Sequence, residues 1–180
     1  MFKGIWKFNY WFLEEELNNT IKERQKILNE MIENWKLKEN LNHSIEENLE
    51  KNRIWLLGEL LFKIFIWWTL NNNLTWWYDI ITKTWVKIDV KTIKTNKKLN
   101  KETLNKYKFY LQFNQIKDDV IYCPIFINEI DKEFAIYFNS NMLGSNIKTN
   151  FNPIFENPPF TKTNDKIKNY VIPYLRIYNR

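Results

Sequence analysis

Apolar residues in the first part of the chain recur at intervals of three, four or seven positions. Between Phe12 and about Asn52 the recurring residues are Leu13, Leu17, Ile21, Leu28, Met31 and Trp35. This spacing is typical of an amphipathic helix, and the segment Asn40–Asn42 predicts a break into two helices. We expect the apolar stripe either to pack on the core of the chain or to form an interface between copies of it, because its flanks carry Glu and Lys.

A more uniformly apolar segment, Ile54–Leu70, predicts a buried helix that ends at three asparagines. Its length of about 17 residues is near the lower limit for crossing a membrane. It also carries Glu59 and Lys63, and each charge at mid-bilayer would cost about 2.5–3.5 kcal/mol. We therefore expect a core helix and no membrane partner. Glu59 lies four residues before Lys63, which suits an ordinary helix ion pair, but a buried acid can equally be paired with a metal.

The pattern then changes to a period of two, which is typical of strands. Trp76–Ile81 is aromatic and β-branched, Thr84–Ile93 alternates between apolar and polar residues, and Thr82-Lys83 can form the turn between them. One face of the second strand would carry Val86, Ile88 and Val90, and the other Lys87, Asp89 and Lys91.

A hairpin of these two strands can bring Asp79 beside Asp89 and Lys91. Two carboxylates and an ammonium group would then converge at the rim of a sheet. Such a cluster forms a site for a divalent metal and an activated water.

The rest of the chain predicts a helix at Lys101–Lys117 and strands at Val120–Asn128 and Phe134–Phe138. From Asn139 onward the prolines, Asn and Thr predict an ordered but irregular arm, with a last strand at Tyr170–Tyr178. This order of elements predicts an α/β (α+β) fold, in which helices flank a mixed β-sheet. The expected division is an N-terminal helical extension (1–52), a core (53–140) and a C-terminal arm packed on the core (141–180).

Composition excludes several classes of function. With 180 residues, 44% of them hydrophobic, the chain is long enough for one domain with a sizeable core. It has only 3 glycines and no glycine-rich nucleotide-binding motif. One cysteine and one histidine allow no internal disulfide, histidine triad or zinc site. We expect Cys123 to be buried. We also expect the protein to be cytoplasmic, in a reducing compartment, and residues 1–12 to hold no secretory signal.

Positive charge is concentrated in the part of the chain that holds the acid–lysine pattern. Residues 1–52 carry 8 Lys and Arg against 10 Asp and Glu, whereas residues 53–180 carry 19 against 11, within a net charge of +6. A basic run follows Asp89, and such a run is often only a solvated loop. Beside the candidate metal site, it also suits contact with the phosphate groups of a nucleic acid. The candidate nucleic-acid-binding residues are Lys94, Lys97, Lys98 and Lys101.

Three short motifs resemble the small PD-(D/E)xK endonucleases, a group that includes restriction enzymes, junction resolvases and some homing nucleases. The motifs are Gly58-Glu59 on the apolar helix, Tyr78-Asp79 on the first strand and Asp89-Val90-Lys91-Thr92 on the second. The resemblance covers roughly residues 54–140. Two departures are that Tyr78 replaces the proline of the motif and that the second acid is Asp instead of the commoner Glu.

The resemblance implies a restriction-endonuclease-like core and a Mg²⁺-dependent endodeoxyribonuclease, with Mn²⁺ as an alternative ion. Asp79, Asp89 and the backbone carbonyl of Val90 would bind the ion, and Glu59 would hold a second ion or an outer-shell water. Lys91 would position or deprotonate the attacking water. The implied substrate is double-stranded DNA, with restriction or homing favoured over junction resolution. A double-strand cut would need a homodimer or higher homo-oligomer, since each chain has one motif.

Two other interpretations of the same residues remain. The basic run and exposed aromatic residues could belong to a non-catalytic nucleic-acid-binding protein. The N-terminal helices could belong to a structural or assembly protein, in which the acid–lysine face is only solvated.

Overall fold

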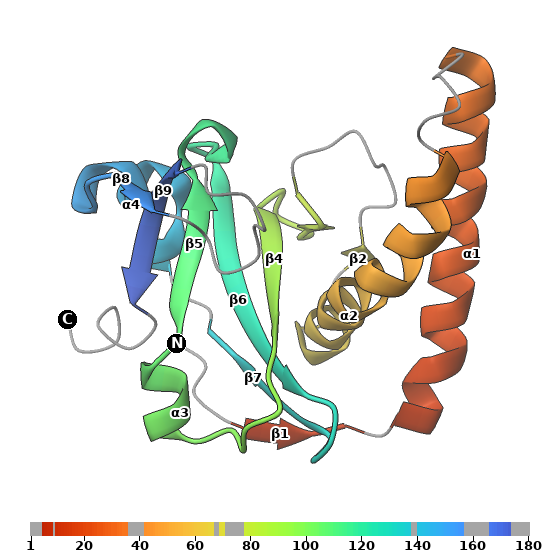
Figure 1. The fold of residues 1–180 in the computed structure, drawn as a ribbon, viewed down its shortest axis with the longest axis horizontal. Coiled ribbons are helices and arrows are strands. Elements are labelled where there is room, and N and C mark those ends of the chain that lie inside the picture. The colour runs from red at the N-terminus through yellow and green to blue at the C-terminus, as the bar shows by residue number, and fades with distance from the viewer. Residues whose placement is uncertain are drawn as a thin grey trace.

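The structure is a computed structural model that describes residues 5–8, 10–35, 42–66, 69–70, 78–137, 140–156 and 166–173. Its centre is a six-stranded mixed sheet in the order β1-β7-β6-β4-β3-β2 (Figure 1). The strands are β1 (Ile5–Lys7), β2 (Thr69–Leu70), β3 (Ile80–Ile81), β4 (Lys87–Lys94), β6 (Val120–Asn128) and β7 (Glu133–Ile136). Only β4 and β6 pair in parallel, and the other neighbours are antiparallel. The predicted mixed sheet with flanking helices is thus confirmed.

A smaller antiparallel sheet has the order β5-β9-β8 and joins the middle of the chain to its C-terminal part. Its strands are β5 (Lys108–Gln112), β8 (Ile154–Glu156) and β9 (Ile167–Pro173). Short helices accompany this sheet, namely α3 (Lys101–Asn105), η2 (Phe113–Gln115), η3 (Ser140–Met142) and α4 (Gly144–Asn150). The C-terminal arm is therefore more regular than predicted, and its last strand begins at Ile167 instead of Tyr170.

The helix predicted at Lys101–Lys117 is wrong beyond Asn105, where α3 ends. The side chain of Asn100 accepts a hydrogen bond from the Thr103 backbone N–H at 2.8 Å and so caps the start of α3. After Asn105 the period changes to two, because Phe109 and Leu111 are buried while Lys108 is exposed. Pairing with β9 supplies the backbone hydrogen bonds that a helix would otherwise make.

Two long helices, α1 (Tyr10–Trp35) and α2 (Asn42–Ile66), pack on each other. The α2 helix begins at the predicted break but is continuous through residue 54, so the expected boundary between residues 52 and 53 lies inside it. It also ends before Leu70, because Thr69 and Leu70 pair with β3. Within the described residues, no helix is both long and apolar enough to cross a membrane.

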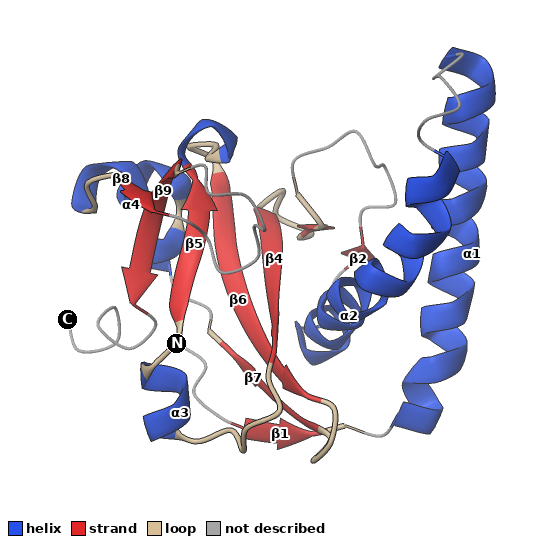
Figure 2. Ribbon diagram, in the orientation of Figure 1, coloured by secondary structure: helices blue, strands red, loops and turns tan. Residues whose placement is uncertain are grey.

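The helices α1 and α2 lie to one side of β4 and β6, and the smaller sheet lies to the other (Figure 2). A hydrophobic cluster lies on each face of the six-stranded sheet. On one face Cys123 and Ile125 of β6 pack with α1 and α2. On the other face Tyr122 and Phe126 pack with α3, β5 and α4. Burial on both faces explains why β6 reads as a nearly continuous apolar run. Cys123 is fully buried, as predicted.

Candidate functional site

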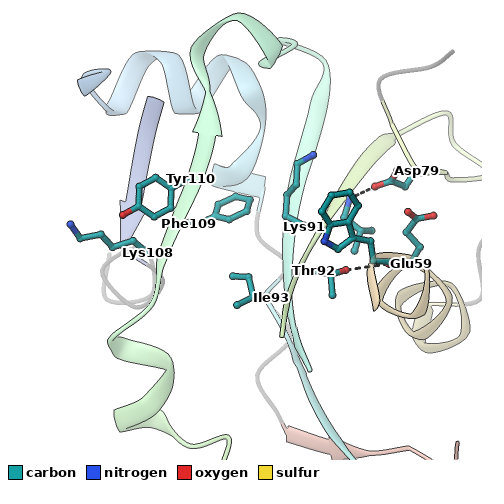
Figure 3. Close-up of a pocket in the computed structure, with 10 residues that line it drawn as sticks. Glu59, Asp79, Lys91, Thr92, Ile93, Lys108, Phe109 and Tyr110 are labelled. Carbon is teal, nitrogen blue, oxygen red and sulfur yellow. Dashed lines mark hydrogen bonds between the residues drawn. The ribbon is translucent and has the colours of Figure 1, made fainter. Parts of the chain in front are cut away.

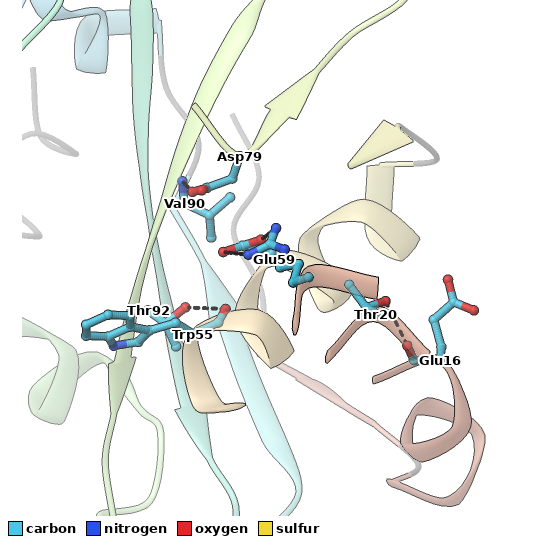
Figure 4. A network of polar contacts seen from close by, with 8 residues as sticks. Glu16, Thr20, Trp55, Glu59, Asp79, Val90 and Thr92 are labelled. Atoms are coloured by element: carbon cyan, nitrogen blue, oxygen red, sulfur yellow. Dashed lines mark hydrogen bonds and ion pairs between the residues drawn. The ribbon is translucent and has the colours of Figure 1, made fainter. Parts of the chain in front are cut away.

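Gly58 lets α2 lie directly on β4. A Cβ atom added at Gly58 would lie 2.0 Å from Thr92 Oγ1 and 2.9 Å from Ile125 Cγ2. The Thr92 hydroxyl donates a hydrogen bond to the Trp55 carbonyl oxygen at 3.2 Å, which ties the helix to the strand (Figure 4). This close approach brings the next residue, Glu59, against the sheet, where only 6% of it is exposed.

Replacing this glycine tests the close approach. Gly58→Ala should lower the free energy of unfolding by about 1–3 kcal/mol, because the added methyl group overpacks the contact. At an open helical position the same change would instead be stabilising by about 1 kcal/mol. Urea denaturation measures the difference, and the cost should be smaller in a Thr92→Ala background. An equal cost in both backgrounds would contradict the contact.

The hairpin between β3 and β4 places Asp79. Its turn is held by Thr82, whose hydroxyl oxygen accepts hydrogen bonds from the backbone N–H groups of Thr84 at 3.2 Å and Val86 at 2.9 Å. Trp85 adopts φ 64° within this turn and is 80% exposed. The turn is longer than the predicted Thr82-Lys83, and β4 begins only at Lys87.

Asp79 lies just before β3 and faces the middle of β4. Its backbone N–H donates to the Ile88 carbonyl oxygen at 2.9 Å. Its carboxylate Oδ2 accepts a hydrogen bond from the Val90 backbone N–H at 2.7 Å (Figure 4). The predicted hairpin contact is therefore present, although Asp79 itself lies outside the strand.

Asp89 and Lys91 lie on the same face of β4, as the alternation predicted. Lys91 Nζ lies 2.7 Å from Asp89 Oδ1. Ile88 and Val90, on the opposite face, are buried in the cluster that contacts α2. The sequence thus correctly predicted which side chains of this strand share a face.

Burial makes the three acids hard to ionise. It raises the pKa of Asp89 to about 7, although Lys91 opposes this shift. Burial also raises the pKa of Asp79 against the effect of Lys91. Burial and then the Asp79 charge raise the pKa of Glu59 to about 8, against the effect of Arg24. A bound cation would favour the ionised forms of all three groups.

Lys91 stays an ammonium group at neutral pH. Burial lowers its pKa, but the carboxylates of Asp89 and Asp79 outweigh burial, so that the pKa is raised overall. Of the two roles expected for Lys91, donating hydrogen bonds and positive charge therefore suits it better than removing a proton from water.

Arg24 of α1 is a site residue that the sequence did not reveal. Its Nη2 lies 2.5 Å from Glu59 Oε2, and its Nη1 lies 3.4 Å from Glu59 Oε1. Lys63, whose spacing suits a helix ion pair with Glu59, instead lies 2.9 Å from Glu16, so that alternative is wrong. A buried acid needs a partner, but the sequence could not identify a cation 35 residues away on another helix.

Two adjoining cavities open beside these residues, with volumes of about 260 and 270 Å³. Both are lined by Trp55, Lys91 and Tyr110. The first also reaches Glu59 and Asp79, and in it the ring of Phe109 points from β5 toward β4 (Figure 3). The second also reaches Asp89 and carries three amide side chains, Gln112, Gln115 and Asn169. The cavities thus lie between α2 and β4 on one side and the smaller sheet on the other.

The predicted nucleic-acid-binding lysines lie toward the other end of β4. Lys94 ends the strand and pairs with Glu129, and Lys97 and Lys98 are exposed in the loop that follows. Lys101 is the first residue of α3, and its side chain lies outside the described residues. Five residues separate Lys94 from Asp89, which is about 16 Å along a strand. Lys94, Lys97 and Lys98 do not line the two cavities, whereas Lys108 lines the first.

The donor groups of the site suit a hard divalent cation. Asp79 and Asp89 supply carboxylate oxygens and Val90 a backbone carbonyl, which are ligand types that Mg²⁺ prefers. Both carboxylates are buried beside each other, where a cation would relieve their repulsion. Glu59 is held apart by Arg24, and among the described residues no three His, Cys, Asp or Glu side chains are grouped to hold one ion together.

Known proteins provide no relative with which this site can be compared. No family model, no curated protein and no solved structure matches the chain.

Proposed function

We propose that the chain is a metal-dependent DNA endonuclease whose centre is formed by Asp79, Asp89, Lys91 and Glu59. The observation that carries this proposal is the hydrogen bond that the Asp79 carboxylate accepts from the Val90 backbone N–H at 2.7 Å. That contact holds the carboxylate of Asp79, just before β3, against the strand β4 that bears the acid–lysine pair. It is the arrangement expected of a PD-(D/E)xK site.

The order of elements around these residues supports the same proposal. A helix that bears Glu59 precedes an antiparallel hairpin, and β4 then pairs in parallel with β6. A restriction-endonuclease-like core is proposed on this basis for residues 54–140. The N-terminal helix α1 and the strands β8 and β9, which pair onto β5, are additions to it.

Asp79, Asp89 and the Val90 carbonyl would hold Mg²⁺ or Mn²⁺. When bound, the ion would supply Lewis-acid stabilisation of the phosphate oxygens. The Lys91 ammonium group would orient the attacking water and offset negative charge that develops on the phosphate. Glu59 would hold an outer-shell water. Water would add to phosphorus and give up a proton to solvent, while the bond from phosphorus to the leaving sugar oxygen breaks and that oxygen takes up a proton from solvent.

The proposed DNA would bind at the adjoining cavities beside Lys91. Trp55 and Tyr110 offer aromatic surfaces, and Lys108 offers a positive charge near the first cavity. Aromatic residues can stack on bases that leave the duplex. We propose double-stranded DNA as the substrate, cut by a homo-oligomer of restriction or homing type, because one centre serves one strand.

Plasmid nicking tests the proposal directly. The protein should nick supercoiled DNA with Mg²⁺ and not with EDTA, and Lys91→Ala should lower the rate on the order of 10²-fold while DNA binding persists. The matched control is Lys87→Ala, which removes another lysine from the same face of β4. Lys87 pairs with Asp119 at 2.6 Å. Near-normal turnover in Lys91→Ala would overturn the assignment.

A non-catalytic nucleic-acid-binding protein is the second candidate. It is favoured by one observation, that Lys97 and Lys98 are exposed in the loop after β4 and do not line the cavities beside the carboxylates. It predicts that Lys97→Gln with Lys98→Gln weakens DNA binding, that Lys91→Ala does not, and that no nicking occurs with any metal.

A further inference from the structure

We propose that Arg24 takes the place of a second divalent cation, so that this centre binds one metal ion per chain. The inference rests on the proposed function and concerns how the same site is built. It makes Arg24 a positioning residue, which acts through Glu59, and it gives the N-terminal helix α1 a part in the centre.

The contact occupies both oxygens of Glu59. The two terminal nitrogens of Arg24 lie 2.5 and 3.4 Å from the two carboxylate oxygens. This is a bidentate arrangement of guanidinium and carboxylate. The side chains are 19% and 7% exposed. A second cation at Glu59 would have to displace this guanidinium or share the carboxylate with it, against the repulsion of like charges.

Holding α1 against α2 does not require this ion pair. Glu16 and Lys63 already join the two helices at 2.9 Å, and Glu14 and Arg53 lie 3.7 Å apart. Those two pairs lie at the surface, whereas Arg24 reaches inward to the acid that lines the cavity with Asp79.

The formal charges of the centre agree with one ion. The three carboxylates, together with Lys91 and Arg24, carry a net charge of −1 when all are ionised. One divalent ion and one phosphodiester bring the total to zero. A second divalent ion would leave a net charge of +2 in a partly buried site, which is unfavourable.

Counting bound Mn²⁺ by isothermal titration calorimetry and equilibrium dialysis, without DNA, tests this inference. The parent protein should bind one ion per chain and Arg24→Gln two. The double variant Arg24→Gln, Glu59→Gln should return to one, because the second set of oxygens is then neutral. Lys63→Gln is the matched control, since it breaks another pair between α1 and α2 and should leave the number at one.

An unchanged count of one in folded Arg24→Gln would overturn the inference, and so would a count of two in the parent. If Arg24→Gln does not fold, the single variant Glu59→Gln decides. The inference requires this variant to bind one Mn²⁺ per chain, and a loss of Mn²⁺ binding would overturn it. The two proposals fail separately. Suppose that the parent nicks DNA with Mg²⁺, and that the parent and Arg24→Gln each bind one ion per chain. The nuclease proposal would then remain, and only the role of Arg24 would be refuted.

Discussion

Asp89→Asn is expected to abolish Mg²⁺-dependent cleavage while DNA binding in EDTA stays as strong as in the parent or becomes stronger. The substitution keeps the shape of the side chain and removes its charge. It therefore takes away a ligand of the proposed ion. Above about pH 7, where Asp89 is ionised in the absence of metal, it also removes a charge that would repel the scissile phosphate. Plasmid nicking measures the first effect, and a gel shift with duplex DNA in EDTA measures the second.

Asp119→Asn is the matched control for this experiment. Asp119 is a largely exposed carboxylate that pairs with Lys87, one residue away from β6. Its loss removes the same charge from the protein without touching the site, so nicking should persist. Calorimetric titration with Mg²⁺ completes the comparison, and equal Mg²⁺ affinity in Asp89→Asn and the parent would refute the nuclease proposal.

The part of the site that the sequence predicted depends on local patterns. The period of two in β4 determines that Asp89 and Lys91 share a face. The short connection to β3 then limits where Asp79 can lie, and its contact with Val90 follows. A buried position for Glu59 also followed from its apolar neighbours.

The parts that failed depend on contacts between distant segments. Residues 108–112 satisfy a helical pattern about as well as a strand pattern, and the strand forms because β9, more than 50 residues later, pairs with it. Arg24 likewise reaches Glu59 only because α1 packs on α2. Neither partner can be identified from spacing within one segment of the chain.

Without metal, the stability of the protein should fall as the pH rises from about 5 to about 8. The folded protein keeps protons on Glu59 and Asp89, whose pKa values burial raises to about 8 and about 7. The unfolded chain has released these protons above about pH 4.5. Folding therefore takes up protons in this window, and the free energy of unfolding decreases by about 1.4 kcal/mol per pH unit for each proton taken up.

Urea denaturation in EDTA at pH 5, 6, 7 and 8 measures this slope. Glu59→Gln with Asp89→Asn should make it shallower, because only Asp79 of the three buried acids then still titrates. Glu102→Gln, which changes an exposed acid paired with Lys106, should not change it. Saturating Mg²⁺ should also flatten the slope in the parent, since the ion binds the ionised carboxylates in place of protons. A stability that rises with pH across this window in EDTA would show that the acids are ionised in the apo protein, and the buried carboxylate centre described here would be wrong.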